Sequence, residues 1–194
     1  MTMVEPSSGM RARLKENASK HNLTNIICIP KKWEDVEIGK DIEAGGYDVV
    51  IASHSLVMKD MQSALSKMND AMKRSTYMFI VAGRRRETDK NSLWTLFSKE
   101  QIGRRPDYIY LYNILYQMGI YANVEIIDVD HNTQFPDLDA AVRHYKGWRG
   151  ISGDDEGKLR SYLRENLIRD DGALWLRHNM RTAMIWIQKE DDLK

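Results

Sequence analysis

The chain has 194 residues, of which 42% are hydrophobic and 29% charged, values typical of one globular domain with a sizeable core. Lys and Arg number 29 and Asp and Glu 28, so the net charge of +1 provides no global field for nucleic acid or an anionic membrane. The only cysteine, Cys28, excludes an intrachain disulfide and a cysteine-based metal site. We therefore expect a single domain over residues 1–194 in the cytoplasm, with no metal and no membrane span.

The first half of the chain alternates short apolar runs with helical patterns. The predicted elements are a strand ending at Val4, a helix over Ser8–Lys20 capped by Ser7 or Ser8, buried strands over Asn25–Ile29 and Tyr47–Ser53, a helix over Met58–Met72, and a strand over Ser75–Gly83. Strands that alternate with helices call for a parallel sheet.

The second half continues with further helices and two late strands. The predicted elements are a short helix around Ser92–Ser98, a helix over Pro106–Met118 stopped by Gly119, a strand over Asn123–Asp130, helices over Leu138–Tyr145 and Glu156–Leu167, and a final strand over Arg181–Lys189. The whole predicts an α/β doubly wound sheet, and such sheets bind ligands at the carboxyl ends of their strands.

Glu5 follows the first predicted strand directly and is the first candidate for ligand binding. A carboxylate in this position can accept hydrogen bonds from both hydroxyls of a ribose. The alternative is a solvated acid at a helix start, where a negative charge is favoured by the helix dipole.

The segment PKKWEDV follows the second predicted strand. Trp33 offers a flat apolar ring for a nucleobase, and Glu34 or Asp35 could accept a hydrogen bond from an exocyclic amine. The alternative is a surface loop in which Trp33 packs against the sheet edge, as tryptophan is usually buried for packing reasons alone.

Two further loops carry polar candidates. Ser53 and His54 end the Tyr47–Ser53 strand, and His54 could hydrogen-bond a ligand or act as a general base near neutral pH. The arginines of AGRRRE, after the next strand, could contact an acidic or phosphorylated substrate, although such a run is more often a solvated loop.

The order and spacing of these segments resemble those of a known family. VEPSSGM, KKWEDV, YDVVIASHSLV and YMFIVAGR look like successive segments of the class I S-adenosylmethionine-dependent methyltransferases, and more closely like a prokaryotic group with VEPS, WEDV and ASHS loops. The later segments PDYIYLYNILYQMGIYANVEII and DDGALWLRHNMRTAMIWI are also similar to that group.

The resemblance implies a Rossmann-like, mostly parallel sheet with an antiparallel last strand. It also implies that a first strand, a G-x-G-x-G turn and a helix would precede VEPS, so the chain is expected to be truncated at its N-terminus and to lack the strand between those of Val4 and Tyr47–Ser53. The unpaired edges left there could be closed by another chain, such as a second copy.

The resemblance also implies which residues of this chain contact each part of S-adenosyl-L-methionine. It places Glu5, beside Pro6, on the ribose, Trp33 near the adenine, and Ser53 and His54 beside the methionine moiety and methyl group. Many members of the family carry an acid immediately before the Trp33 position, which is Lys32 here, so Glu34 or Asp35 would take the adenine amine.

Two functions follow as hypotheses. The first is a methyltransferase that transfers the methyl group of S-adenosyl-L-methionine to an unidentified acceptor, with His54 as the candidate base. The second is a non-catalytic methyltransferase-fold protein that acts as an interaction module or is a remnant.

Overall fold

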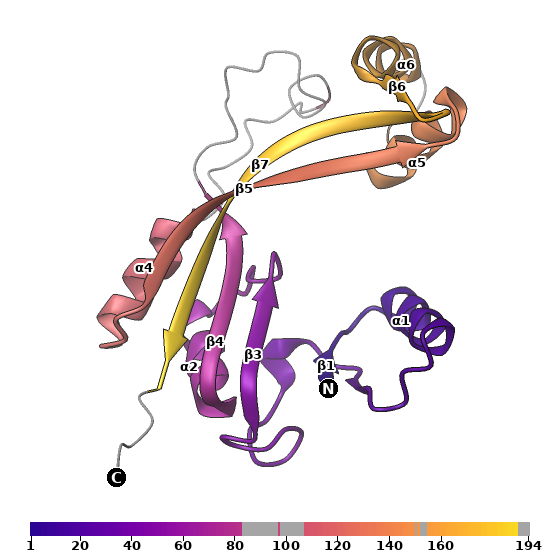
Figure 1. Cartoon of the computed structure of the whole chain (residues 1–194). Helices are drawn as coiled ribbons and strands as arrows, with labels where there is room; N and C mark the ends of the chain where they lie inside the picture. The colour runs from indigo at the N-terminus through magenta and orange to yellow at the C-terminus, as the bar shows by residue number, and fades with distance from the viewer. Residues whose placement is uncertain (83–96, 98–106, 150, 152–154, 190–194) are drawn as a thin grey trace. The chain divides into compact units, whose positions relative to one another are not determined.

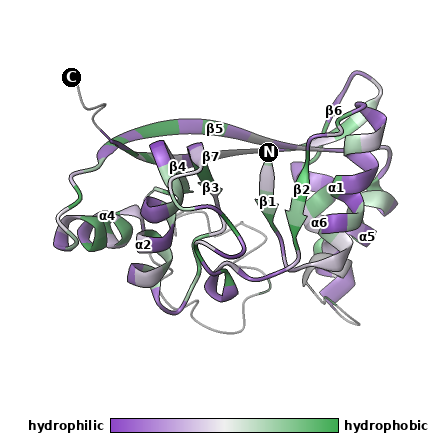
Figure 2. Ribbon diagram, turned by 90° about the horizontal axis from the view of Figure 1, so that it is seen from below, coloured by the Kyte–Doolittle hydropathy of each residue, from purple (hydrophilic) through white to green (hydrophobic). Residues whose placement is uncertain are grey.

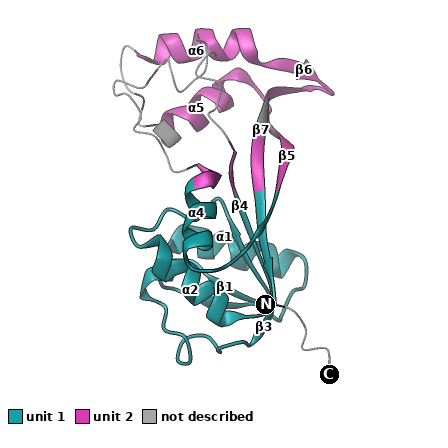
Figure 3. Cartoon of the chain, turned by 90° about the vertical axis from the view of Figure 1, so that its left-hand side faces the viewer, with its two compact units in different colours: residues 1–79, 110–124, 184–194 teal, residues 80–109, 125–183 magenta. Residues whose placement is uncertain are grey.

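The computed structural model describes residues 1–82, 97, 107–149, 151 and 155–189, without the side chains of residues 131, 148–149 and 178–180. Two compact units divide the chain (Figure 3). Unit 1 comprises residues 1–79, 110–124 and 184–194, and unit 2 comprises residues 80–109 and 125–183. A single domain over the whole chain stays a prediction.

The regular elements follow the predicted order closely. They are β1 (Thr2–Val4), α1 (Ser8–Lys20), β2 (Ile27–Ile29), the 3-10 turn η1 (Trp33–Asp35), β3 (Tyr47–Ser53), α2 (Met61–Ala71), β4 (Met72–Val81), α4 (Tyr108–Gln117), β5 (Asn123–Phe135), α5 (Leu138–Arg149), α6 (Asp155–Asn166), β6 (Ile168–Asp170) and β7 (Ala173–Gln188).

The strands form two sheets (Figure 1). β1 pairs with β2 in parallel, and a five-stranded sheet has the order β3-β4-β7-β5, with β6 paired to β7. β3 and β4 are parallel. β7 runs antiparallel to β4, as the arrows in Figure 1 show: the N–H of Lys189, past the end of β7, donates to the carbonyl of Arg74, near the start of β4. The predicted α/β fold with an antiparallel last strand is confirmed.

Several predicted boundaries were wrong. Met72 opens β4 instead of ending α2, and β5 and β7 are longer than predicted, since β5 reaches Phe135 and β7 already begins at Ala173. β6 was not predicted. The helix expected around Ser92–Ser98 and the AGRRRE arginines lie outside the described residues, except for Phe97, which is helical.

The core of unit 1 gathers around α2 and β4. Met61, Leu65 and Met68 on α2 are buried. A smaller cluster, here called the Val36 cluster, consists of the buried side chains of Val36, Ile42 and Ala71, with Val4, Ile29, Trp33, Ile38, Tyr47 and Val50 packed against it.

The N-terminal part of unit 1 is less covered than its sequence predicts. No side chain of residues 1–35 is buried, and polar and charged residues make up most of α1 (Figure 2). The predictions that β2 and β3 are buried strands were therefore wrong: Ile27 is 63% exposed on β2, and Val49 and Ile51 are 50% and 65% exposed on β3. These side chains are apolar, but no layer of the described residues covers them.

Unit 2 has its own apolar core. Residues from the end of β5, from α5 and α6, and from the start of β7 bury one another: Phe135, Ala141, Val142, Tyr145, Ile151, Leu159, Tyr162, Leu163 and Leu176. The Phe135 and His144 rings meet edge to face with centroids 5.5 Å apart.

Two substitutions on neighbouring strands test this distribution of burial. Met78 on β4 is 0% exposed, so Met78→Ala should lower the free energy of unfolding by about 2–5 kcal/mol through lost contacts and a cavity. Ile51→Ala on β3 should change it by no more than about 0.5 kcal/mol because that side chain already faces solvent. Urea unfolding measures both values. A large loss for Ile51→Ala would contradict the open face of β3.

Candidate functional site

Contacts connect the segments that follow β1, β2 and β3. The N–H of Glu5, directly after β1, donates to the carbonyl of Ile29 at the end of β2 at 3.1 Å, in line with the parallel pairing of these two strands. The backbone N–H of Lys59, in the segment after β3, donates to Glu34 Oε1 in the turn after β2 at 3.4 Å. Each of the three strands also places a side chain against the Val36 cluster. The segments that follow β1, β2 and β3 therefore belong to one connected region of unit 1.

Glu5, directly after β1, is half-buried and held at the start of α1. Its Oε1 accepts the N–H of Ser7 at 2.8 Å, and Ser7 caps α1 by accepting the N–H of Met10. Arg11 Nη1 donates to the carbonyls of Glu5 and Pro6 at 3.0 and 2.6 Å. The turn around Glu5 is thus fixed, and the acid lies where the helix dipole favours it. A role on a ribose stays a prediction.

Trp33 opens the three-residue turn η1, here called the WED turn. Its ring is half-buried against the Val36 cluster, and its indole N–H donates to the carbonyl of Ala64 on α2 at 3.0 Å. This contact corresponds to the packing alternative for Trp33. A role beside an adenine stays a prediction.

The two acids of the WED turn differ in their contacts. Glu34 Oε1 lies 3.4 Å from the backbone nitrogen of Lys59, whose N–H it accepts. Asp35 is exposed, and no contact of its carboxylate exists among the residues that the structure describes. Asp35 thus has neither oxygen engaged by a described residue, and Glu34 has one.

Ser53 ends β3 and His54 follows it, and both residues are exposed. The N–H of His54 donates to the carbonyl of Phe79 at 2.9 Å, which extends the pairing of β3 with β4 by one residue. His54 then adopts a φ of 51°, in the left-handed region that side chains other than glycine rarely occupy. Such backbone conformations cluster at functional sites.

An ion pair joins the two ends of the loop that carries the WED turn. Lys31 Nζ contacts both carboxylate oxygens of Asp41 at 2.6 and 2.8 Å, and Asp41 also accepts the N–H of Glu37. The hydrogen bond from Lys31, followed by that from the Glu37 backbone, holds the pKa of Asp41 below its ordinary value.

The residues of α2 that hold the WED turn were not among the predicted site residues. Ala64 accepts the Trp33 indole, and Lys67 Nζ donates to the carbonyl of Glu34 at 2.6 Å. Their spacing of three residues places them on one helix face. Nothing in the sequence indicates that this face meets a loop more than 30 residues earlier.

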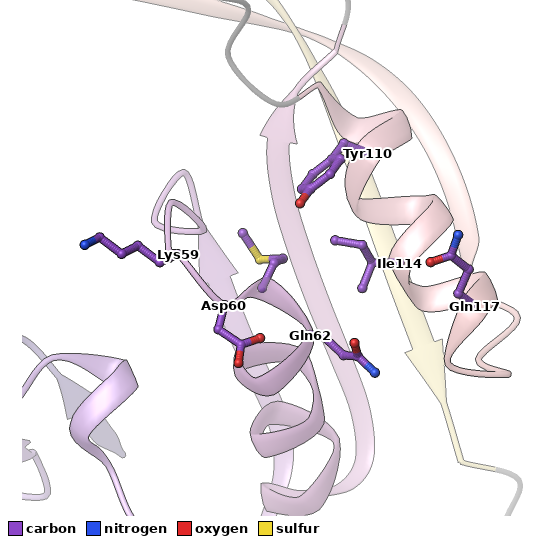
Figure 4. A pocket seen from close by; sticks show the side chains of 7 residues that line it. Lys59, Asp60, Gln62, Tyr110, Ile114 and Gln117 are labelled. Carbon is purple, nitrogen blue, oxygen red and sulfur yellow. The ribbon is translucent and has the colours of Figure 1, made fainter.

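A cavity of about 340 Å³ lies between α2 and α4 of unit 1. Tyr110 and Ile114 extend from α4 toward α2, and Gln62 extends from α2 toward α4 (Figure 4). Lys59, Asp60, Met61 and Gln117 complete its lining, so none of the predicted site residues contributes to it.

The edges of β1 and β3 nearest each other are unpaired. In the part of the chain that the structure describes, β1 pairs only with β2, and β3 pairs only with β4. The sheet is therefore interrupted between β1 and β3, where the resemblance implies a further strand.

Over the same described residues, no group of three or more His, Cys, Asp or Glu side chains could hold a metal ion. No described helix has both the length and the apolar character needed to cross a bilayer.

No protein-family profile matches the chain. One curated relative is an uncharacterized protein of Haemophilus influenzae, 30% identical over 148 residues. The match covers 74% of this chain and 53% of the relative, so the chain spans about half the length of the curated relative it matches.

Solved structures show the fold. A Bacillus halodurans protein assigned as a methyltransferase has a TM-score of 0.60 at 7% identity, with 98% of this chain and 83% of that chain covered. Coclaurine N-methyltransferase bound to N-methylheliamine and SAH has a TM-score of 0.51 at 14% identity, with 96% of this chain and 58% of that chain covered. The protein has the fold of the class I S-adenosylmethionine-dependent methyltransferases.

The Lys31–Asp41 pair makes the stability of this loop depend on pH. Because the folded pKa of Asp41 is lowered, its contribution is present above its ordinary value of 3.8 and is lost as pH falls through the folded pKa. Asp41→Asn should lower Tm at pH 7, and the difference from wild type should shrink below about pH 4. Thermal unfolding across this range measures it. Glu37→Gln, which removes the more exposed pair with Lys40, is the control and should leave Tm nearly unchanged.

Proposed function

We propose that the protein is an S-adenosylmethionine-dependent methyltransferase that acts on an unidentified acceptor in the cytoplasm. One observation carries the proposal: on a methyltransferase fold, the turn of Glu5, the WED turn and the strained His54 loop follow β1, β2 and β3, and hydrogen bonds join the first to the end of β2 and the second to the segment after His54. The likeness to a structure that contains SAH supports a cofactor of this type.

In the proposed complex, the Glu5 carboxylate binds the ribose hydroxyls beside Pro6. It can do so while it keeps the Ser7 N–H, because an ionised carboxylate has about four acceptor sites. The backbone of Trp33 lies nearest the adenine, and Glu34 or Asp35 takes its amine. Ser53 and His54 flank the methionine moiety and the methyl group.

The chemistry is attack by an acceptor atom on the sulfonium methyl, in which the carbon–sulfur bond breaks as the new bond to carbon forms. Catalysis of this kind depends mainly on holding the two reactants in line in a site that excludes water. His54 is the proposed base for acceptors that must lose a proton, since a neutral imidazole has a ring nitrogen that can accept one.

Calorimetric titration with S-adenosyl-L-methionine tests the proposal. Wild type should bind, and Glu5→Gln should weaken binding about tenfold or more because charge-assisted hydrogen bonds to the ribose are lost. Gln keeps an acceptor for the Ser7 N–H, so α1 should stay capped. Glu16→Gln, an exposed acid on the same helix, is the matched control and should bind as wild type does. Absence of binding by folded wild type would contradict the proposed function.

A second candidate function is that of a non-catalytic interaction module. The observation that favours it is the interrupted sheet: within the described part of the chain, β1 and β3 each present an unpaired edge, and Val49 and Ile51 lie exposed on β3. Long apolar strand edges tend to pair with other chains. The proposed partner is a second copy of this chain, which would pair at the β3 edge.

The association state distinguishes this candidate. Sedimentation at micromolar concentration should show a dimer, and Ile51→Lys should convert it to a monomer, since a charge at the strand edge opposes pairing. Val57→Lys, at a residue 84% exposed in the loop after β3, is the control and should leave the dimer intact. A monomeric wild type would exclude pairing at β3.

A further inference from the structure

The WED turn is too short to hold its own conformation. It has three residues, and two backbone hydrogen bonds join it to the residues on either side. The Asp35 N–H donates to the Lys32 carbonyl at 3.0 Å, and the Val36 N–H donates to the Trp33 carbonyl at 3.2 Å. Isolated turns of this length are not stable in water, because the entropy of ordering the backbone exceeds the gain from so few hydrogen bonds. Contacts from outside the turn must therefore fix it.

Two of these contacts come from one face of α2. The carbonyl of Ala64 accepts the Trp33 indole N–H at 3.0 Å, and Lys67 Nζ lies 2.6 Å from the Glu34 carbonyl and 3.4 Å from the Trp33 carbonyl. The first contact holds the side chain of the turn, and the second holds its backbone. Val36, 1% exposed, anchors the end of the turn in the core.

The ammonium group of Lys67 serves this contact alone. Among the described residues it forms no ion pair with a carboxylate, and its hydrogen-bond acceptors are the two carbonyls of the turn. The Glu34 carbonyl accepts no backbone N–H among the described residues, so Lys67 satisfies it. A cation beside carbonyl oxygens at the end of a helical turn is also favoured by their dipoles.

The same turn is tied to the loop that carries His54. Glu34 Oε1 accepts the N–H of Lys59, which lies in the segment between His54 and the start of α2. Lys67 holds the backbone of the residue whose side chain makes this contact. A change in the position of Glu34 would therefore alter both the WED turn and the loop that carries His54.

From these contacts we propose that Lys67 is a positioning residue that fixes the WED turn for the adenine end of the cofactor. The inference rests on the proposed function for its ligand. Lys67 itself touches the turn and not the ligand: with its ammonium in place, the turn keeps one conformation before binding, so binding costs less conformational entropy. Without it, the turn samples several conformations and adenine binds more weakly.

The experiment compares Lys67→Met with Lys189→Met. Methionine keeps an apolar chain of similar length and removes the charge. Lys189 is a matched control in unit 1 because its Nζ also donates to two carbonyls, of Asn69 at 3.1 Å and Met72 at 2.8 Å, away from the WED turn. Lys67→Arg keeps a cation and should behave within about twofold of wild type, which reports on the charge even if Lys67→Met does not fold.

Two readouts separate the positioning role from the proposed function. Hydrogen exchange at the Asp35 and Val36 amides needs no ligand, and in Lys67→Met it should be about threefold to tenfold faster than in wild type and Lys189→Met. Calorimetry with adenosine and with S-adenosyl-L-methionine should show both dissociation constants raised by the same factor of about three to ten, because the turn acts on the adenine that the two ligands share.

Each result decides one of the two claims. Unchanged exchange in Lys67→Met, or an equal loss of adenosine affinity in Lys189→Met, would overturn the positioning role. Faster exchange in Lys67→Met with no binding of either ligand by wild type would support the positioning of the turn and overturn the proposed function.

Discussion

Burial of the Val36 cluster is the constraint on which the arrangement of the candidate site depends. The cluster draws β1, β2 and β3 against one apolar surface, through Val4, Ile29 and Val50. Hydrogen bonds from the Glu5 N–H to the Ile29 carbonyl and from the Lys59 N–H to Glu34 Oε1 connect the segments that follow the three strands. Trp33 packs against the same cluster, so the WED turn is placed by the packing that also places the strands.

Several polar groups of the candidate site already have hydrogen-bond partners. The Ser7 N–H donates to one carboxylate oxygen of Glu5, and the Lys59 N–H donates to one carboxylate oxygen of Glu34. The indole N–H of Trp33 donates to the carbonyl of Ala64. These contacts fix each group in one orientation, which is the condition for a preorganised site.

Sequence patterns located the helices and strands well, since local periodicity determines them. The α1 boundaries and those of β3 agree with prediction to the residue. The same reasoning was wrong about burial in β2 and β3: an apolar run indicates which side chains favour burial, and whether a layer covers them depends on neighbours elsewhere in the chain. Ile27 and Ile51 satisfy the pattern and remain exposed.

The sequence by itself determined the fold class and the candidates Glu5, Trp33, Ser53 and His54, because strand ends can be located from local patterns and ligands bind there. Tertiary structure decided how those residues are held. The contact of Lys67 with Glu34 joins residues 33 positions apart, and its partner atom is a backbone carbonyl. Every residue type has that carbonyl, so no sequence pattern can indicate which one a lysine will reach.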